Sequence, residues 1–568
     1  MKRGFTCSFA ALMLVATMGA AVGCNAGGGI PDGAQALSCS TGINADTGLY
    51  DNSLFYRNDL DFLDAPDPGA IYEDGYFYVV VTGAPFKCWR TNNFANWEYM
   101  GFVFQPSDDA WSYGNYWAPE IIKNPAGDGY YLYYSASAKE LPQGAADATM
   151  YERMHIGVAY SENVYGPYEE CRDAEGNTIY FDFLESPAVQ AQLEGKSAKI
   201  FATIDAHPFF DGEDLYLYFV QQDDRNTSGN AIWGVKMKSF TEPDYSTAKQ
   251  LTEPRLTSLG GSVIDTEDGN TVNEAPWMTK HTTIKENGDS VTKYYLTFSN
   301  YGYTDRRYSV ATAVADSPLG DFVKLDSSHG QPMHGIAPDF DHMSGTGHHS
   351  FVQAGDELFI LYHAHTDREH GSTTRALAAD RVVWTYDEEL GYDILHSNGP
   401  TYSLQPVPAV TSGYSNIAAD ATVTATNITA GESALLTDGI VAIQTFDDDT
   451  ELHVSADGTS ITLEFETERT VRAVMVYNSR EIWLAFSKID SIVLEGEQGS
   501  YYIRDLAFPS AYYWDDLSLM RPGGAAVAEF GEIPVRKITI NISQKLIPDV
   551  QNENFADIAI SDIVILGK

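Results

Sequence analysis

Three carboxylates in similar surroundings are the residues of this sequence best suited to do chemistry. Asp67 lies in DAPDPGAIYEDGYFYVVV, Asp205 in TIDAHPFFDGEDLYLYFV and Glu274 in TVNEAPWMTKH, each close to a proline and to an aromatic-rich run typical of a strand. An acid beside a buried strand costs desolvation free energy unless function or pairing compensates for it. One such acid often caps a turn, but three in one setting indicate a single site assembled from distant parts of the chain.

These acids belong to a repeat that extends from about residue 66 to 405. Each copy has a polar residue, a short apolar strand, a Gly/Asp turn and an aromatic-rich strand, a pattern that predicts hairpins. Five copies predict the blades of a five-bladed β-propeller, in which the innermost strands start at a central channel. We therefore expect one residue from each copy to converge at the channel mouth. They are Asp67, Glu120, Asp205, Glu274 and His348.

Length and charge limit the possible partners. A chain of 568 residues exceeds the size of a single hydrophobic core, so we expect at least two domains. It carries 35 basic and 79 acidic residues, a net charge of -44 that repels phosphate backbones and anionic lipid surfaces. The composition therefore excludes nucleic acid as a partner and favours neutral substrates.

The N-terminus has the features of an export signal. In residues 1–23, Lys2 and Arg3 precede an apolar run that is too short for a permanent membrane span. The run ends in AVGC, which resembles a bacterial lipobox, so we expect Cys24 to anchor the mature protein outside the cytoplasm by a lipid. An ordinary cleaved signal is the alternative. Residues 24–45 are rich in glycine and predict a flexible tether.

The character of the chain changes near residue 413. Alternating runs such as SITLEFE, VRAVMVY and RKITINI predict a jelly-roll-like β-sandwich over residues 413–568. The fold class is therefore all-β, with a propeller over residues 46–408 and LQPVPAVTSGY as the linker. Every candidate acid precedes this linker, so we expect a truncation near residue 408 to keep the reaction centre. Cys39, Cys88 and Cys171 show no metal-ligand spacing and leave room for one disulfide.

Five pieces of the repeat resemble glycoside hydrolase family 43, whose members are five-bladed propeller glycosidases. The pieces are APDPGAIYEDGYFYV, YWAPEI, IDAHPFF, NEAPWM and GTGHHSFV, in the family's order over about residues 55–400. The chain departs from the family at Ala206-His207, where a proline usually follows the aspartate, and at Ala275, where the family often has glycine. The first departure predicts a place for His207 near the sugar.

The resemblance implies a role for each acid. Asp67 corresponds to the general base and Glu274 to the general acid, while Asp205 orients the acid and raises its pKa by like-charge repulsion. The residue types agree, because glycoside cleavage needs a protonated acid at the leaving oxygen and an ionised carboxylate across the sugar. The family inverts the anomeric configuration, which implies that the carboxyl groups of Asp67 and Glu274 lie roughly 6.5 to 9.5 Å apart.

The resemblance also implies supporting residues. His348 matches a histidine that holds a central metal ion, usually calcium, through water molecules. Arg375 matches a substrate-binding arginine, with a surface ion pair as the alternative. Trp117 and Trp89 are candidate sugar-stacking walls, with burial in the core as the alternative.

The C-terminal region resembles discoidin-type (coagulation factor 5/8 type C) modules, which are related to family 32 carbohydrate-binding modules. The matching pieces are SNIAADATVTAT, LLTDG, ITLEFETERTVRAVMVY and DIAISDIVILGK. The resemblance implies either sugar binding or a spacer role. Tyr512, Tyr513 and Trp514 are the candidate stacking residues, and Asp438 lies where such modules often hold a structural calcium ion.

Together these features predict an exported, lipid-anchored, exo-acting glycosidase of the α-L-arabinofuranosidase type that releases a terminal pentose or related furanose from oligo- or polysaccharide. A β-xylosidase or galactan-directed enzyme with the same machinery is the alternative within the enzyme class. A non-catalytic sugar-binding lipoprotein is the alternative from another class. The three acids argue against it, because a binder has no need of a proton donor opposite a base.

Overall fold

Nearly all regular structure in the chain is β-strand, which confirms the predicted all-β class. Among the described residues, no helix is long and apolar enough to cross a membrane. The computed structural model describes residues 30–41, 54–58, 64–127, 129–139, 154–183, 200–223, 230–252, 272–335, 343–367, 370–444, 447–507, 523–548 and 556–568, with the isolated residues 186, 187, 189, 191 and 254.

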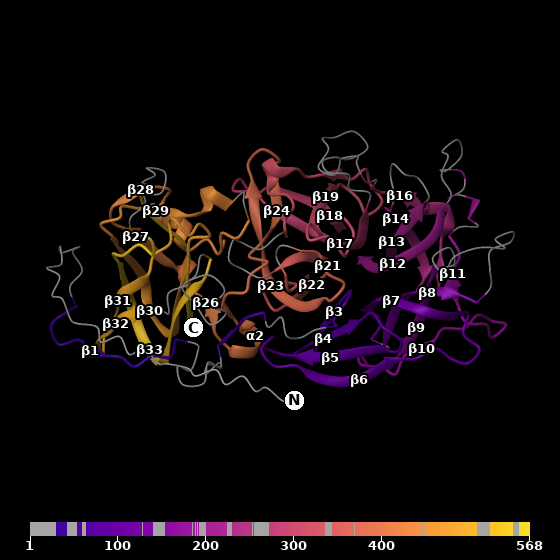
Figure 1. Cartoon of the computed structure of the whole chain (residues 1–568), viewed down its shortest axis with the longest axis horizontal. Coiled ribbons are helices and arrows are strands. Elements are labelled where there is room, and N and C mark those ends of the chain that lie inside the picture. The colour runs from indigo at the N-terminus through magenta and orange to yellow at the C-terminus, as the bar shows by residue number, and fades with distance from the viewer. Residues whose placement is uncertain are drawn as a thin grey trace, which may run out of the picture.

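Five antiparallel blades lie around a common centre and form the predicted propeller (Figure 1). Blades two and three join through one parallel pair between Ala202 and Met154. The strands of each blade are ordered from the channel outward. Blade one consists of β3 (Gly69–Glu73), β4 (Tyr76–Val81), β5 (Phe86–Thr91) and β6 (Glu98–Phe104). Blade two consists of β7 (Ser112–Lys123), β8 (Tyr130–Ala138) and β9 (Met154–Ser161), with β10 (Glu169–Glu170) and β11 (Tyr180–Phe181). Blade three consists of β12 (Ile200–Asp211), β13 (Asp214–Asp223) and β14 (Ala231–Ser239), with β15 (Glu242–Pro243), η2 (Tyr245–Thr247) and β16 (Lys249–Gln250). Blade four consists of β17 (Asn273–Ile284), β18 (Ser290–Asn300), β19 (Ser309–Ala315) and β20 (Val323–Lys324), followed by η4 (Ser327–His329). Blade five consists of β21 (Ser344–Ala354), β22 (Glu357–His365), β23 (Ala376–Asp387) and β24 (Tyr392–Ser397).

The aromatic-rich strands pack blade against blade. Side chains between neighbouring blades form five apolar clusters, one at each blade interface, so every blade is buried on two faces. The ring closes where β2 (Phe55–Tyr56) pairs with β25 (Gln405–Pro406), which joins the first and last segments of the propeller. Tyr56 and Val407 then fill the cluster between blades five and one.

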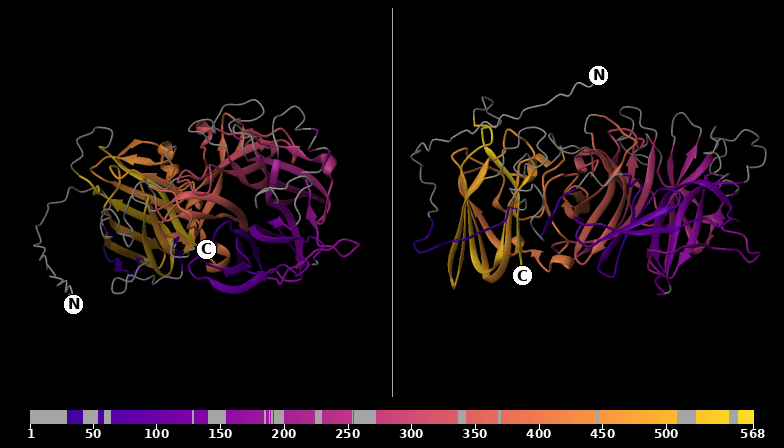
Figure 2. Two further views of the ribbon diagram at one scale, coloured as in Figure 1. Left: turned by 45° about the vertical axis from the view of Figure 1, so that its right-hand side comes forward. Right: turned by 60° about the horizontal axis from the view of Figure 1, so that its bottom comes forward.

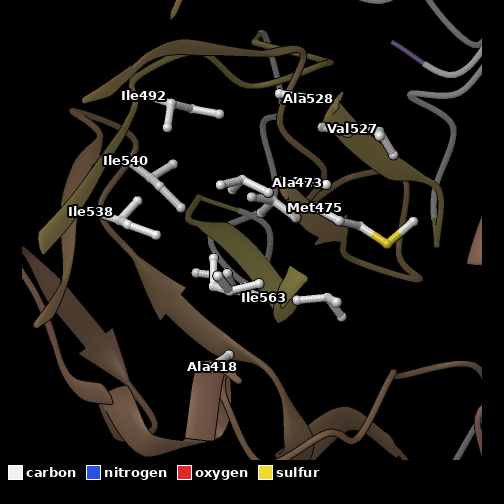
Figure 3. Packing of buried hydrophobic residues seen from close by; sticks show 14 of the residues in the cluster. Ala418, Ala473, Met475, Ile492, Val527, Ala528, Ile538, Ile540 and Ile563 are labelled. Atoms are coloured by element: carbon white, nitrogen blue, oxygen red, sulfur yellow. The ribbon is translucent and has the colours of Figure 1, made fainter. Parts of the chain in front are cut away.

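The C-terminal unit is a curled β-sheet around one apolar core (Figure 3). Two long strands, β30 (Thr459–Asn478) and β33 (Ala525–Ile542), pair along most of their length and place mainly aliphatic side chains in this core. The other elements are β26 (Ser415–Asn416), η5 (Ala418–Asp420), β27 (Ala421–Ala425), β28 (Ile428–Ala430), η6 (Ser433–Leu436), η7 (Asp447–Thr450), β29 (Leu452–Val454), β31 (Lys488–Gly496), β32 (Gly499–Ala507) and β34 (Ile558–Gly567).

The sandwich and the propeller share a core, which the sequence did not predict. They lie side by side in both views of Figure 2 and are joined by a short helix, α2 (Ala409–Ser412). Leu54, Phe55 and Leu404 of the propeller closure are buried in the same cluster as the sandwich strands. The Asn398 side chain donates a hydrogen bond to the Gly439 carbonyl at 2.9 Å. A truncation near residue 408 would keep the candidate acids but would remove one side of this shared core.

The described part of the predicted flexible tether is an ordered strand. β1 (Gln35–Ala36) pairs in parallel with β32 at the edge of the sandwich. Ser40 exchanges backbone hydrogen bonds of 2.7 and 2.9 Å with Glu529. Leu37 and Cys39 pack against the sandwich core. Pairing with a sheet edge satisfies backbone groups that would otherwise stay unpaired. The segment is therefore ordered by the edge of a distant domain, which its own composition could not indicate.

Two further expectations concern the export signal and the cysteines. The signal of residues 1–23, together with Cys24, lies outside the described residues. Cys39, Cys88 and Cys171 are free thiols, so they form no disulfide with one another.

Candidate active site

Each innermost strand bends sharply at one residue whose backbone is left-handed. Non-glycine residues adopt this conformation at a cost of about 1 to 3 kcal/mol each and do so mainly at functional sites. In blades two to five the strand register shifts at this point, as it does at a β-bulge. The five residues and their φ angles are Asp67 (52°), Ala118 (44°), Asp205 (55°), Ala275 (52°) and His348 (47°).

This bend corrects the predicted register of the five convergent residues. Asp67, Asp205 and His348 occupy the left-handed position itself. Glu274 precedes that position by one residue, and Glu120 follows it by two. Glu120 instead pairs with His207 Nδ1 at 2.6 Å.

A cavity of about 250 Å³ opens where the innermost strands meet. It brings together the three predicted acids, His348, Arg375 and Trp117, whereas His207 and Trp89 are not among its lining residues. The lining comes from all five blades and consists of Asp67, Thr82, Trp117, Ile204, Asp205, Gln222, Glu274, Tyr303, His348 and Arg375.

Asp67 is held as an anion by three neighbours. Arg375 Nη1 donates to Oδ1 at 2.6 Å, and His348 Nδ1 lies 3.2 Å from the same oxygen. Thr82 Oγ1 donates to Oδ2 at 2.6 Å. Burial alone would raise the pKa of Asp67, but Arg375, His348 and the hydrogen bond from Thr82 hold it below its ordinary value. Asp67 can therefore accept a proton at neutral pH.

Glu274 has the opposite tendency. Tyr308 Oη donates to Oε1 at 2.8 Å, and Asn230 Nδ2 lies 3.4 Å from Oε2. Burial and the nearby charge of Asp67 raise the pKa of Glu274 to about 7, although the hydrogen bond from Tyr308 and the charge of Arg375 oppose this rise. Glu274 therefore keeps its proton at weakly acidic pH and can act as an acid.

The pKa of Asp205 depends on the charges of both Asp67 and Glu274. Its Oδ2 accepts the backbone N–H of Ala275 at 3.1 Å, next to Glu274. Burial and the charges of Glu274 and Asp67 raise the pKa of Asp205 to about 7, against the influence of His348. Because Asp205 and Glu274 titrate together, ionisation of either one favours the protonated form of the other.

Arg375 and Tyr303 form one wall of the cavity. The Arg375 guanidinium lies 4.5 Å from the centre of the Tyr303 ring, while it also contacts Asp67. The backbone carbonyl of Tyr303 is 2.8 Å from His365 Nε2. Arg375 is thus an ion-pair partner of Asp67, with only 13% of its side chain exposed, and it contacts an aromatic ring that lines the cavity.

Two predicted wall residues do not lie at the cavity. Trp89 belongs to β5, the third strand of its blade, and its ring packs 5.3 Å from that of Tyr99. His207 is buried, with its ring 4.3 Å from that of Trp277. Its Nδ1 lies 2.6 Å from Glu120 Oε1, so its side chain is engaged in that pair and not in the cavity.

The calcium ion expected beside His348 would be held through water molecules, because the described side chains at the channel offer no direct set of ligands for it. Calcium takes six to eight oxygen ligands, whereas His348 Nδ1 faces Asp67, whose oxygens are already paired with Arg375 and Thr82. Within the described ranges, no three His, Cys, Asp or Glu side chains gather in a way that could hold a metal ion. We assign no step of the reaction to a metal.

The sandwich offers a better fit for a cation at the predicted Asp438. Burial raises the pKa of Asp438 to about 6, and its Oδ1 accepts the N–H of Ile440 at 2.9 Å. Burial and the charge of Asp438 raise the pKa of Asp562, whose Oδ1 has no partner among the described residues. Asp438 and Asp562 are neighbouring carboxyl groups, of which Asp562 is buried and has its pKa raised by the charge of Asp438, and such a pair suits a shared cation in donor type. Tyr512, Tyr513 and Trp514 lie outside the described residues.

Sequence reasoning missed several residues of the site. Thr82, Asn230 and Tyr308 contact the carboxylates of Asp67 and Glu274, and Gln222 and Tyr303 line the cavity. All five lie outside the proline-containing pieces that mark the innermost strands. The sequence does carry a signal for Trp117. WAPE and EAPW share Ala-Pro, so Trp117 aligns with Glu274, and both residues line the cavity.

Comparison with solved structures finds similar folds. A thermostable family-43 glycoside hydrolase is 25% identical, with a TM-score of 0.48, over 62% of this chain and 99% of its own. An endo-1,4-beta-xylanase from Bacteroides thetaiotaomicron is 23% identical, with a TM-score of 0.41, over 61% and 98%. An alpha-L-arabinofuranosidase from Lactobacillus brevis is 18% identical, with a TM-score of 0.42, over 60% and 95%. No curated protein matches the chain.

The sequence family of the propeller is clear from a direct match. The model of glycosyl hydrolases family 43 matches residues 56–390, which is more than half of the chain and spans all five blades. The chain therefore belongs to glycosyl hydrolases family 43 and is a glycoside hydrolase.

Proposed function

We propose that this glycoside hydrolase removes single terminal pentose units, in the manner of an α-L-arabinofuranosidase. The observation that supports this proposal is the size and shape of the site. The described residues line a cavity of about 250 Å³, below the roughly 300 to 1,000 Å³ of pockets for drug-sized ligands. Such a space suits one sugar ring at a chain end better than the interior of a polymer.

The proposed reaction is a single displacement with inversion. Asp67 takes a proton from a water molecule as the water oxygen bonds to the anomeric carbon. The bond from that carbon to the leaving oxygen breaks, and the leaving oxygen receives the proton of Glu274. Both carboxyl groups return to their starting states when Asp67 passes its proton to solvent and Glu274 takes one up.

The neighbours of the two catalytic groups support this assignment. Arg375 favours the ionised form of Asp67, while burial favours the protonated form of Glu274. Environments that separate the pKa values of two carboxyl groups are typical of an acid-base pair. Asp205 accepts a hydrogen bond from Ala275 and so orients the backbone beside Glu274. A purely sugar-binding lipoprotein would gain nothing from this separation, which argues against that alternative.

A β-xylosidase or galactan-directed enzyme remains the alternative within the enzyme class. Trp117 and Tyr303 offer aromatic surface to a pyranose as well as to a furanose ring. The direct test is hydrolysis of nitrophenyl α-L-arabinofuranoside, β-D-xyloside and β-D-galactoside, with the anomer of the first product followed by NMR. Preference for the arabinofuranoside with an inverted product supports the proposal. A retained anomer contradicts the mechanism, and a preferred xyloside or galactoside contradicts the specificity.

A matched set of variants separates catalysis from folding. Asp67→Asn and Glu274→Gln remove each catalytic group with little change in volume, and each is expected to lower turnover of unactivated glycosides about 10²- to 10⁴-fold. Asp214→Asn is the control, because Asp214 forms only an exposed ion pair with Lys236 at 2.7 Å. Normal turnover in either active-site variant contradicts the assignment.

We further propose that the protein is exported and anchored by a lipid on Cys24, and that the sandwich binds calcium through Asp438 and Asp562. The signal pattern of residues 1–23 supports the first proposal. The buried, unpartnered Oδ1 of Asp562 supports the second. A discoidin-like role in sugar binding stays a proposal that rests on the sequence pattern of residues 413–568.

A further inference from the structure

We propose that Tyr308 and His363 act as one unit, a stacked ring pair that fixes the general acid relative to the general base. The proposal rests on the assignment of Glu274 and Asp67 to these roles. Neither ring lines the cavity, so both are positioning residues rather than catalytic ones. The pair links two blades, because Tyr308 directly precedes β19 of blade four and His363 belongs to β22 of blade five.

Tyr308 holds the acid end of the unit. The residue is fully buried, and its Oη donates to Glu274 Oε1 at 2.8 Å. Its own N–H donates to the Asp305 carbonyl at 3.0 Å, which fixes the backbone. A Cβ atom on Gly347 would lie 2.5 Å from the Tyr308 ring, so the opposite strand has room for this ring only because residue 347 is glycine.

His363 holds the base end. It is fully buried, and its Nδ1 accepts the backbone N–H of Asp67 at 3.3 Å. The same nitrogen lies 3.6 Å from Asp67 Oδ1. Burial and the charge of Arg375 lower the pKa of His363, so the ring is neutral. A neutral ring whose Nδ1 accepts a hydrogen bond carries its proton on Nε2, and this Nε2 has no partner among the described residues.

The two rings lie against each other in parallel planes. Their centroids are 5.3 Å apart and the planes differ by 4°. Buried rings in a close-packed interior cannot shift independently. A continuous path therefore extends from the backbone of Asp67 through His363 and Tyr308 to the carboxylate of Glu274. Since the separation of the two carboxyl groups decides whether a water molecule fits between base and sugar, the ring pair controls the step that defines the stereochemistry.

Two single variants probe the ends of this path. Tyr308→Phe keeps the ring and removes the hydrogen bond to Glu274. The other charged and polar groups around Glu274 are Asp67, Asp205, Arg375 and Asn230, and the variant leaves them in place. We expect kcat to fall about 10-fold, because small misplacements of reacting groups are costly. The basic limb of the pH-rate profile should shift upward by about one unit, since a lost hydrogen bond to a charged acceptor destabilises the ionised form.

His363→Phe keeps the stack and removes the acceptor of the Asp67 N–H, so kcat should fall about 10-fold with the basic limb of the pH-rate profile unchanged.

The double variant tests whether the two residues act as one unit. Independent losses multiply, so two 10-fold losses would give about 100-fold. A coupled pair should lose only about 10- to 20-fold in the double variant, with KM little changed in all three. Tyr133→Phe is the matched control, because Tyr133 is a buried tyrosine whose Oη donates to the Phe240 carbonyl at 2.7 Å, away from the cavity.

The outcomes separate this proposal from the proposed function. Multiplicative losses, or an unshifted basic limb in Tyr308→Phe, overturn the ring-pair proposal while leaving the function intact. The limb can be measured on any glycoside that the enzyme cleaves, so a wrong sugar assignment does not affect the test. If the wild type cleaves no glycoside, the proposed function fails, and the same double-mutant cycle is carried out on the free energy of unfolding. Additive destabilisation there overturns the ring pair as well.

Discussion

Removal of the sandwich should destabilise the propeller rather than merely detach a binding module. The perturbation is a stop after residue 408, directly after β25 closes the ring. Leu54, Phe55 and Leu404 lose the sandwich side of their shared core. The hydrogen bonds that Asn398 donates to Gly439 and that Gln444 donates to the Gly399 carbonyl are also lost.

The size of the effect follows from these contacts. Full burial of one large apolar side chain stabilises by about 1.5 to 3 kcal/mol, so the three together account for roughly 5 to 9 kcal/mol. A folded protein is usually stable by only about 5 to 15 kcal/mol. With an unfolding entropy of about 2.1 cal/mol/K per residue over about 350 residues, the midpoint of thermal unfolding should fall by roughly 7 to 12 °C.

The assay compares thermal unfolding and nitrophenyl glycoside turnover of the full-length and truncated proteins. In the full-length chain, Leu404→Ala should lower the midpoint for both units in one transition, whereas Ile284→Ala at the exposed end of β17 should not. A truncated protein that unfolds at the full-length midpoint and keeps its turnover would refute the reasoning, because the shared core would then contribute nothing to ring closure.

Four further outcomes are expected. Glu274→Gln should retain more activity on nitrophenyl glycosides than Asp67→Asn, because a good leaving group needs little protonation, and equal losses on all substrates contradict this. Turnover should decline as pH rises through about 7, where Glu274 ionises, and should decline in acid only below the ordinary range of Asp67, as a pH-rate profile will show. Cys24→Ser should release the protein from the membrane fraction or block processing, and unchanged anchoring contradicts the lipid proposal. Chelation should lower the unfolding midpoint more at pH 8 than at pH 5, because Asp438 is ionised only above about 6, and Asp562→Asn should abolish the difference.

Much of the fold and the core of the site could be predicted from the sequence. The Gly/Asp turns between aromatic-rich runs are local features, so the blades were predictable from short stretches. The acids were predictable because Asp67, Asp205 and Glu274 each interrupt an otherwise apolar stretch. The assignment of Asp67 as base and Glu274 as acid came from the family resemblance. The structure adds the electrostatic reason, which is the position of Arg375 some 308 residues away in the chain.

What sequence reasoning missed depends on contacts between distant segments. Glu120 was placed with the other acids because it occupies a similar position in its copy of the repeat. The left-handed residue of its strand is Ala118, two residues earlier, and alanine gives no signal of positive φ as glycine or asparagine would. The tether was judged from composition, whereas β1 is ordered by the edge of β32. Tyr308 and Asn230 lie in segments without a motif, and only the folded ring brings them to Glu274.

The strained backbone of the site explains why ring closure matters for catalysis. Ala118 and Ala275 lack both the freedom of glycine and the functional side chains of the other left-handed residues, yet the bends at these positions direct Trp117 and Glu274 toward the cavity. Such bends persist only where the surrounding structure fixes them. Their surroundings are the inter-blade clusters, which need a closed ring, and closure depends on β2, whose Phe55 lies in the sandwich core. The sandwich therefore supports the geometry of the acid through packing, although it contributes no side chain to the cavity as described.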